Sequence, residues 1–319
     1  IQLAMIQSKF LETALQHLRI KNAHDHLPTA MGEKMVMRIF DPEVLQRSFQ
    51  ELGLNHRELD VWNRLTTNNH GIVLVTGPTG SGKTTTLYST LRSLASSEVN
   101  VCTIEDPIEM IEPSFNQIQV HNAIDLTFST GVRALLRQDP DIIMIGEIRD
   151  LATAEMAIQA SLTGHLVLST LHTNDAPSAI TRLMELGVPA YLINATLLGV
   201  MAQRLVRTLC PHCKQAAPID DSLWSDFIRG SKIDQGTPYK PAGCLECRQT
   251  GFLGRIGLYE MLEVTENLKS FVNPGSDLQA LRGQAIEDGL KTLRVSGANK
   301  VAAGLTTIGE VLRVTPIVG

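Results

Sequence analysis

The sequence lacks an apolar run long enough to cross a membrane. A membrane-spanning helix needs roughly 18 or more consecutive apolar residues, and the nearest candidate, 192–202, is interrupted by Asn194 and Gly199. No signal peptide, internal repeat or low-complexity segment is recognisable in the sequence. The chain opens on Ile1 instead of Met, so we expect it to be a piece of a longer protein.

The chain also has a small net charge and few aromatic side chains. Aromatic residues make up 4% of the chain, and the formal net charge is −5. A general nucleic-acid binder carries a basic face, so we expect no nucleic-acid partner. The hydrophobic content of 43% is ample for packed cores, and a length of 319 residues indicates about two domains.

Cysteine is rare, and most of it is paired along the chain. Four of the five cysteines form two C-x-x-C pairs, and the fifth, Cys102, lies in an apolar stretch and is expected in the core. Thiolates at C-x-x-C spacing can bind one tetrahedral Zn²⁺, whereas redox pairs or free thiols are the alternatives. The predicted zinc ligands are Cys210, Cys213, Cys244 and Cys247.

The most specific motif is Gly-Pro-Thr-Gly-Ser-Gly-Lys-Thr at 77–84, which fits the P-loop pattern G-x-x-x-x-G-K-[ST]. An apolar run at 72–76 predicts a strand before the motif, and leucines at helical spacing predict a helix behind it. Lys83 would reach the β- and γ-phosphates of ATP, and the Thr84 hydroxyl would bind Mg²⁺. The predicted nucleotide-binding residues of this loop are Gly77, Pro78, Thr79, Gly80, Ser81, Gly82, Lys83, Thr84 and Thr85.

Strands and helices alternate from about residue 71 to 207, which predicts a mostly parallel α/β sheet covered on both faces. The flanking stretches have patterns of their own. We expect helices at 3–18, 41–53 and 58–66, a turn-like stretch at 21–30 and a strand at 35–40. After the cysteines we expect a strand within 251–264, helices at 278–288 and 290–303, and a last helix with a capping box at 307–310.

Polar residues follow several predicted strands of this sheet, at the edge where open α/β sheets bind ligands. Glu147 would orient or activate the attacking water, or help to hold Mg²⁺; the alternative is a surface acid. Glu105, Asp106 and Glu109 would help to hold Mg²⁺ and its waters, although Asp-Pro also starts turns unaided. His172 would sense the γ-phosphate, or be a satisfied structural histidine.

Arg133 and Arg137 are one turn apart on a helix predicted at 128–138. Two cations on one helical face repel each other unless an anion lies opposite. They would pair with Asp139, Asp141 or another neighbouring acid, or act as arginine fingers on phosphate across a subunit boundary. Spacing alone favours the local pairing.

Together these motifs resemble the secretion ATPases of the type II secretion and type IV pilus assembly class. The family's Walker A box matches at 77–84, its acidic box at 103–109, its Walker B strand, ending Gly-Glu, at 142–147 and its histidine box at 164–172. The tetracysteine insert matches too. Arg38, Arg133 and Arg137 match family arginines that lie near the nucleotide or at subunit contacts, so the resemblance favours the finger role for Arg133 and Arg137. The chain departs from the family at 21–26, where Lys-Asn-Ala-His-Asp-His replaces an arginine-rich segment, so part of the N-terminal nucleotide contact is altered.

The resemblance implies a RecA-like P-loop NTPase core with a tetracysteine zinc insert and a small C-terminal helical subdomain. It also implies ATP, Mg²⁺ and Zn²⁺ as cofactors, and a homo-oligomeric, usually hexameric ring. Such a ring acts in the cytoplasm on an inner-membrane platform. The expected divisions are an N-terminal remnant and linker at 1–56, the ATPase core at 57–207, the zinc insert at 208–252 and the helical subdomain at 253–319.

Two other functions remain open at this point. A related retraction or DNA-transfer ATPase is one, although retraction ATPases of the family generally lack the tetracysteine insert. A nucleotide-regulated scaffold that binds ATP without turnover is the other, and the intact Lys83 and Glu147 speak against it.

Overall fold

The computed structural model describes residues 24–29, 32–37, 48–228 and 231–315, and the chain forms two compact units, 1–46 and 47–319. In the first unit, β1 (His24–Thr29) pairs antiparallel with β2 (Gly32–Met37). The turn-like conformation expected for 21–30 is therefore wrong where β1 runs, because pairing with β2 outweighs the weak local preference of these polar residues. The expected opening helix and Arg38 lie outside the described residues.

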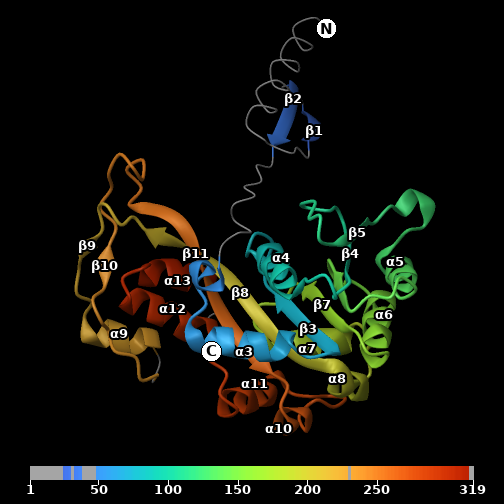
Figure 1. Ribbon diagram of the computed structural model, residues 1–319. Coiled ribbons are helices and arrows are strands. Elements are labelled where there is room, and N and C mark those ends of the chain that lie inside the picture. The colour runs from blue at the N-terminus through green and yellow to red at the C-terminus, as the bar shows by residue number, and fades with distance from the viewer. Residues whose placement is uncertain (1–23, 30–31, 38–47, 229–230, 316–319) are drawn as a thin grey trace, which may run out of the picture. The chain divides into compact units, whose positions relative to one another are not determined.

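A seven-stranded sheet organises the larger unit, in the order β11-β8-β3-β7-β6-β4-β5. β11 is antiparallel to β8, and the other neighbours are parallel, which confirms the predicted mostly parallel sheet. Figure 1 shows β3, β7 and β8 side by side in the middle of this unit. The strands are β3 (Gly71–Thr76), β4 (Val101–Glu105), β5 (Asn116–Gln119), β6 (Ile142–Ile145), β7 (Leu166–Leu171), β8 (Leu197–Leu209) and β11 (Phe252–Glu263).

The core lies on both sides of the central strands. Every residue of β3, β6 and β7 is buried. Because successive side chains of a strand point to opposite faces, burial of all of them means that both faces are covered. The covering helices include α3 (His56–Thr66), α4 (Lys83–Leu94), α5 (Phe128–Leu135), α6 (Leu151–Leu162), α7 (Pro177–Glu185) and α8 (Ala190–Thr196).

Two helix ends show how local chemistry sets the boundaries. The helix predicted at 41–53 is confirmed only at its end: α2 (Phe49–Leu52) ends at Gly53, whose φ is 105°. It begins after Ser48, whose extended backbone and side chain cap it, so the prediction of one continuous helix is wrong at this point. By contrast, α5 ends at Leu135, three residues before the predicted end. Asp139 precedes a proline, which disfavours helical backbone, and its φ is 51°.

The C-terminal helices are not set apart as a subdomain of their own. β11 completes the main sheet beside β8, and α12 (Leu293–Ala302) and α13 (Ile308–Val314) pack against these two strands. The predicted capping box of α13 is half right: Thr307 accepts a hydrogen bond from the Glu310 backbone N–H. The Glu310 carboxylate binds Arg207 instead of reaching back, because a guanidinium is the stronger partner.

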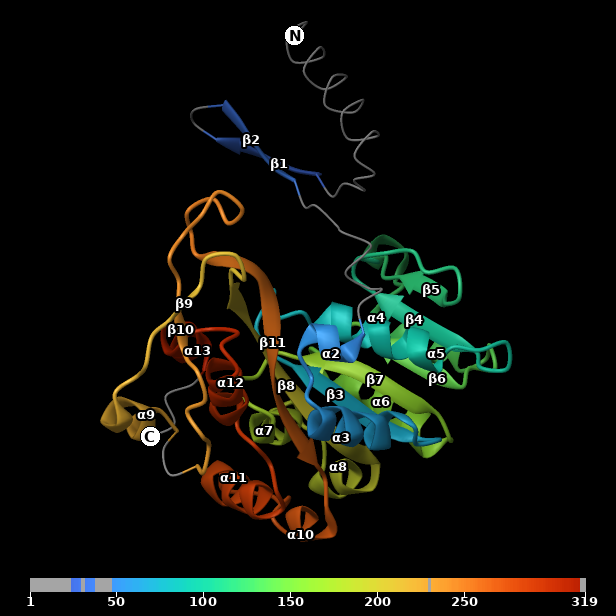
Figure 2. The same cartoon turned by 60° about the vertical axis from the view of Figure 1, so that its left-hand side comes forward.

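The segment that carries the cysteines lies between β8 and β11. It contains β9 (Gln215–Ala216) paired with β10 (Tyr239–Lys240), and α9 (Asp221–Ile228), which packs on α12. Figure 2 shows these elements beside α12 and α13, away from β3 and β7. Among the described helices, none combines the length and the apolar character that a bilayer span requires.

Candidate active site

The P-loop sequence forms the turn between β3 and α4. A Cβ atom at Gly77 would lie 2.5 Å from the Gln203 carbonyl oxygen, so this position requires glycine. α4 begins at Lys83 after Gly82, whose φ is 88°, and no described side chain caps this helix. The first backbone N–H groups of α4 are therefore available to an anion, as at helix N-termini that bind phosphate.

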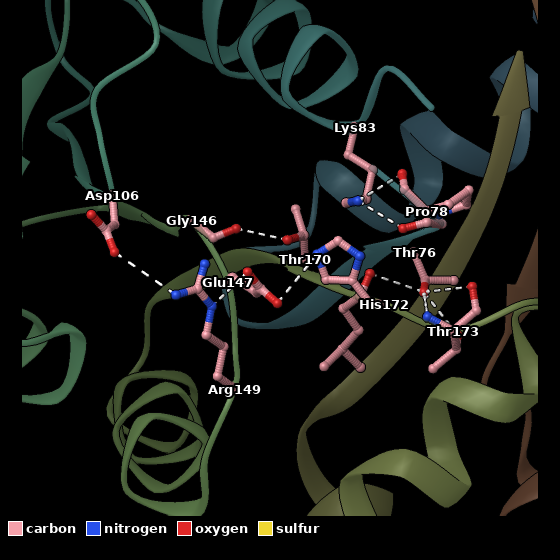
Figure 3. Close-up of polar contacts among 12 residues, drawn as sticks. Thr76, Pro78, Lys83, Asp106, Gly146, Glu147, Arg149, Thr170, His172 and Thr173 are labelled. Atoms are coloured by element: carbon pink, nitrogen blue, oxygen red, sulfur yellow. Dashed lines mark hydrogen bonds and ion pairs between the residues drawn. The ribbon is translucent and has the colours of Figure 1, made fainter. Parts of the chain in front are cut away.

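The Lys83 side chain folds back over this loop. Its Nζ donates hydrogen bonds to the carbonyl oxygens of Gly77 at 2.7 Å and Pro78 at 3.2 Å (Figure 3). Burial lowers the pKa of Lys83 to about 8, the Glu147 carboxylate opposes this shift, and the Arg204 guanidinium adds to it. Lys83 and Glu147 thus lie close enough to influence each other electrostatically.

Glu147 and His172 meet at the carboxyl ends of two paired strands. Glu147 lies just beyond β6 and His172 just beyond β7, and these strands are parallel neighbours. His172 Nε2 lies 3.2 Å from Glu147 Oε1, and Arg149 Nε donates to Glu147 Oε2 at 2.8 Å (Figure 3). With its side chain 19% exposed, Glu147 keeps both oxygens in contact with cations or potential cations.

Arg149 is a contact that the sequence reasoning missed. Besides binding Glu147, its Nη1 lies 3.8 Å from Asp106 Oδ2, so one guanidinium bridges the ends of β6 and β4. The available signal was an arginine two residues beyond the acid that ends a buried strand. Figure 3 shows this side chain between the two acids.

Glu105 is buried and already hydrogen bonded. Its carboxylate accepts from Thr103 Oγ1 at 2.6 Å, from the Tyr88 hydroxyl at 2.7 Å and from Gln117 Nε2 at 3.2 Å. Tyr88 and Gln117 come from α4 and β5, and neither was expected to contribute. These bonds hold Glu105 in place and leave its neighbours as the more accessible acids.

A cavity of about 100 Å³ lies between the loop after β4 and the end of β6. The cavity brings together the start of α4, the acids Glu105, Asp106 and Glu109, and the end of β6. Its polar lining consists of Thr84, Glu105, Asp106, Glu109, Glu147, Arg149 and Thr170. Hydroxyl and carboxylate oxygens are the ligands that Mg²⁺ prefers, so this donor set fits the ion.

Arg133 and Arg137 lie apart from that cavity, on the exposed side of α5 and just after it. Arg137 Nη1 donates to the Arg133 carbonyl oxygen at 2.9 Å, and neither guanidinium forms an ion pair with a described residue. Asp141 instead accepts from the backbone N–H of Asn100. The local pairing with Asp139 or Asp141 is thus not what the structure has.

The four paired cysteines converge on one point. Their sulfurs all lie within 4.8 Å of one another, with separations of 3.8 Å for Cys210–Cys244, 3.8 Å for Cys213–Cys247 and 3.7 Å for Cys244–Cys247. Four thiolates around Zn²⁺ with Zn–S bonds of ~2.3 Å would stand ~3.8 Å apart in a tetrahedron. The donor set therefore fits a closed, four-coordinate zinc site.

Comparisons with known proteins cover most of the chain. The family model for "Type II/IV secretion system protein" matches residues 7–313. The chain is 61% identical to the type IV pilus assembly ATPase TfpB of Acinetobacter baylyi, over 91% of this chain and 50% of that protein. It is 47% identical to the type II secretion system protein HxcR of Pseudomonas aeruginosa, over 91% of this chain and 58% of that protein.

A solved structure shows the same fold. The pilus retraction motor PilT with bound ADP superposes with a TM-score of 0.63 at 25% identity, covering 96% of this chain and 80% of that one. The chain spans about half the length of the curated relatives it matches, 50% of one and 58% of the other.

Proposed function

The chain belongs to the family of type II/IV secretion system proteins, and from this premise we propose that it is the ATP-hydrolysing part of a secretion or pilus assembly motor. The motor would drive extrusion of pilins or pseudopilins from the cytoplasmic side of the inner membrane. The observation that carries the proposal is the position of Glu147. Its carboxylate lies close enough to the P-loop lysine to oppose the lowering of that lysine's pKa, and it lies 3.2 Å from His172, which follows the neighbouring strand.

Binding of ATP would exchange contacts within the loop for contacts to phosphate. The Lys83 ammonium would leave the carbonyl oxygens of Gly77 and Pro78 for the β- and γ-phosphates, and the free N–H groups of α4 would bind the same oxygens. Mg²⁺ would neutralise charge that develops on the phosphates, held by Thr84 and an acid of the adjoining cavity.

Turnover would then depend on Glu147. For its carboxylate to orient the attacking water, at least one of its oxygens has to leave His172 or Arg149. His172 would report the presence of the γ-phosphate, since it follows the strand next to the P-loop strand. Arg133 and Arg137, which form no ion pair with any acid among the described residues, would act as arginine fingers on a neighbouring subunit's nucleotide in a hexameric ring.

The cysteine cluster would hold one structural Zn²⁺. Its four sulfurs fill a tetrahedral set and leave no position for a reacting ligand. The cluster favours an assembly motor over a retraction motor, whose family members generally lack this insert. Zinc, the ring and docking on an inner-membrane platform are thus parts of one proposal.

Phosphate release from Mg²⁺-ATP by the purified chain tests the proposed function. We expect steady release by the wild type and none above background by Lys83→Ala, which removes the cation from the loop. Tight ATP binding without phosphate release, in ring-forming preparations, would contradict the motor and support a nucleotide-regulated scaffold.

A further inference from the structure

In the loop that follows β7, residues 172–176, every residue after His172 forms a hydrogen bond to another part of the chain. Each residue is held by a different element: the end of β3, β8, α11 (Leu278–Glu287) and β11. The contacts are Thr173 N to Thr76 Oγ1 at 2.8 Å, Arg204 Nη2 to Asn174 O at 2.7 Å, Arg282 Nη2 to Asp175 Oδ2 at 2.6 Å, and Ala176 N to Glu260 Oε1 at 2.8 Å. The loop that carries His172 is therefore positioned both by the P-loop strand and by the C-terminal part of the chain.

Glu260, three residues before the end of β11, makes the most unusual of these contacts. Its side chain is buried, and each carboxylate oxygen accepts from the start of a different helix. Oε1 accepts from Ala176 N, the N-cap of α7, and Oε2 accepts from Leu293 N, the first residue of α12, at 3.1 Å. One side chain thus joins the helix behind the His172 loop to a helix of the C-terminal part.

The ionised form of Glu260 is destabilised by burial. Burial raises the pKa of Glu260 to about 7 and the nearby Asp175 carboxylate adds to this, while the two backbone N–H groups and Arg282 oppose it. Arg204 lies near both carboxylates, and burial lowers its own pKa. A carboxylate offers two acceptor oxygens, whereas an amide offers one acceptor and one donor. The ionised carboxylate can therefore accept one N–H group on each oxygen, as Glu260 does, whereas an amide cannot.

We propose that Glu260 is a positioning residue for ATP hydrolysis, which couples the His172 loop to helix α12 by accepting a hydrogen bond from the start of each of the two helices. This inference rests on the proposed function. Asp175 supports the same arrangement, because its Oδ1 accepts from Ser178 N in the first turn of α7 while its Oδ2 binds Arg282. A shift of the loop on nucleotide binding would thus displace α7, Glu260 and α12 together.

The substitution Glu260→Gln tests the coupling with little change of shape. The amide can accept one N–H but faces the other with its own NH₂ group. Loss of one hydrogen bond to a charged group predicts a fall in kcat of about tenfold. We expect ATP affinity to stay the same. Because the substitution also removes a buried charge, Tm should stay the same or rise.

Glu310→Gln is the matched control. Glu310 is another buried acid of the C-terminal part, but its carboxylate binds Arg207 and Arg313 and, among the described residues, has no hydrogen bond or ion pair with the His172 loop. This variant should lower Tm and leave kcat unchanged. An unchanged kcat in Glu260→Gln would overturn the proposal, as would a fall in kcat that comes with lower Tm and weaker ATP binding, which indicates a merely structural role.

Amide hydrogen exchange decides the matter even if the chain proves inactive or Glu260→Gln does not fold. In the wild type, a non-hydrolysable ATP analogue should change exchange at Ala176 and at Leu293 together. A change at Ala176 with none at Leu293, or no change at either while the analogue is bound, would overturn the coupling. Absence of phosphate release by the wild type alone would instead count against the proposed function.

Discussion

The P-loop region and the cysteine cluster are both short motifs on loops, but their side chains differ in whether they already have the arrangement that a ligand requires. The four sulfurs lie within 4.8 Å of one another, and three of their separations are 3.7 or 3.8 Å, close to those of a tetrahedral zinc site. In the P-loop region, the backbone is ready for phosphate, but Lys83 is bound to the loop carbonyls and Glu147 to His172 and Arg149. Metal binding therefore needs no rearrangement of side chains, whereas nucleotide binding does.

This difference indicates what each region is for. A site whose donors stand in their final geometry adds binding energy to folding and stays closed. A site whose charged groups satisfy one another exchanges those partners when ligand arrives, and the exchange can be passed to connected elements. Changes at the cysteines should act on stability, and changes around the P-loop should act on binding and turnover.

Apart from the loss of Lys83 or Glu147, the largest effect is expected at the arginines of α5 and its end. Arg133→Ala or Arg137→Ala should lower kcat by roughly 10³, the lower end of what arginine fingers supply. ATP affinity should change little, because neither residue lies at the loop of its own chain. Phosphate release measured over a range of protein concentrations checks this, since activity per subunit should rise as the ring assembles.

Mixed rings give the control for that prediction. Chains with Arg137→Ala and chains with Glu147→Gln should each be inactive alone, but some interfaces in a mixture join an intact Glu147 to an intact Arg137. Those interfaces should recover activity. If demonstrably mixed oligomers show no rescue, the site is not shared between subunits, and both arginines have a local role.

A smaller effect, on stability, is expected at the cysteines. Elemental analysis of the wild type should find about one zinc ion per chain. Cys210→Ser should remove this zinc and destabilise the segment between β8 and β11 by about several kcal/mol or more. Thermal unfolding measures the loss, and nucleotide affinity should remain close to that of the wild type. Ser222→Ala, on α9 of the same segment, serves as a control that leaves the sulfurs intact. Wild-type protein without metal when freshly prepared and reduced would contradict the zinc site.

The smallest effect concerns the pH dependence of ATP binding. Burial lowers the pKa of Lys83 to about 8 in the unliganded protein, and phosphate requires the protonated ammonium. Above pH 8 Lys83 is mostly a neutral amine, which must therefore take up a proton on binding, so Kd should rise by up to about tenfold per pH unit. Titrations between pH 7 and pH 9.5 measure this, and Lys83→Ala should bind weakly without that rise. A Kd that is flat across this range would show that Lys83 is not the group that meets the phosphates.

Local chemistry explains which features the sequence could predict. The strand, loop and helix around Gly77 to Lys83 depend on residues close together in the chain, and the structure confirms that order. The convergence of two C-x-x-C pairs likewise follows from spacing, and the cluster is present. The roles of the individual site residues and the finer domain boundaries stay predictions.

Long-range partners explain what the sequence could not predict. The acceptor for Ala176 N is 84 residues away in Glu260, and the guanidinium that holds Asp175 is 107 residues away in Arg282. No local pattern marks such pairs, because they depend on how β11 and α11 return to the sheet. The pairing of β1 with β2 was missed for a related reason, since a polar strand is defined by its neighbour more than by its own residues.

The most direct test of the account is single-turnover hydrolysis by Glu147→Gln beside the wild type. The amide keeps the shape of the side chain but cannot orient water as a carboxylate does, so turnover should fall by roughly 10² to 10⁴ while ATP binding is retained. Filter binding with labelled ATP and phosphate release from the same samples give both quantities. The account predicts ATP held intact on Glu147→Gln after the wild type has released phosphate. Hydrolysis by Glu147→Gln at the wild-type rate would contradict it.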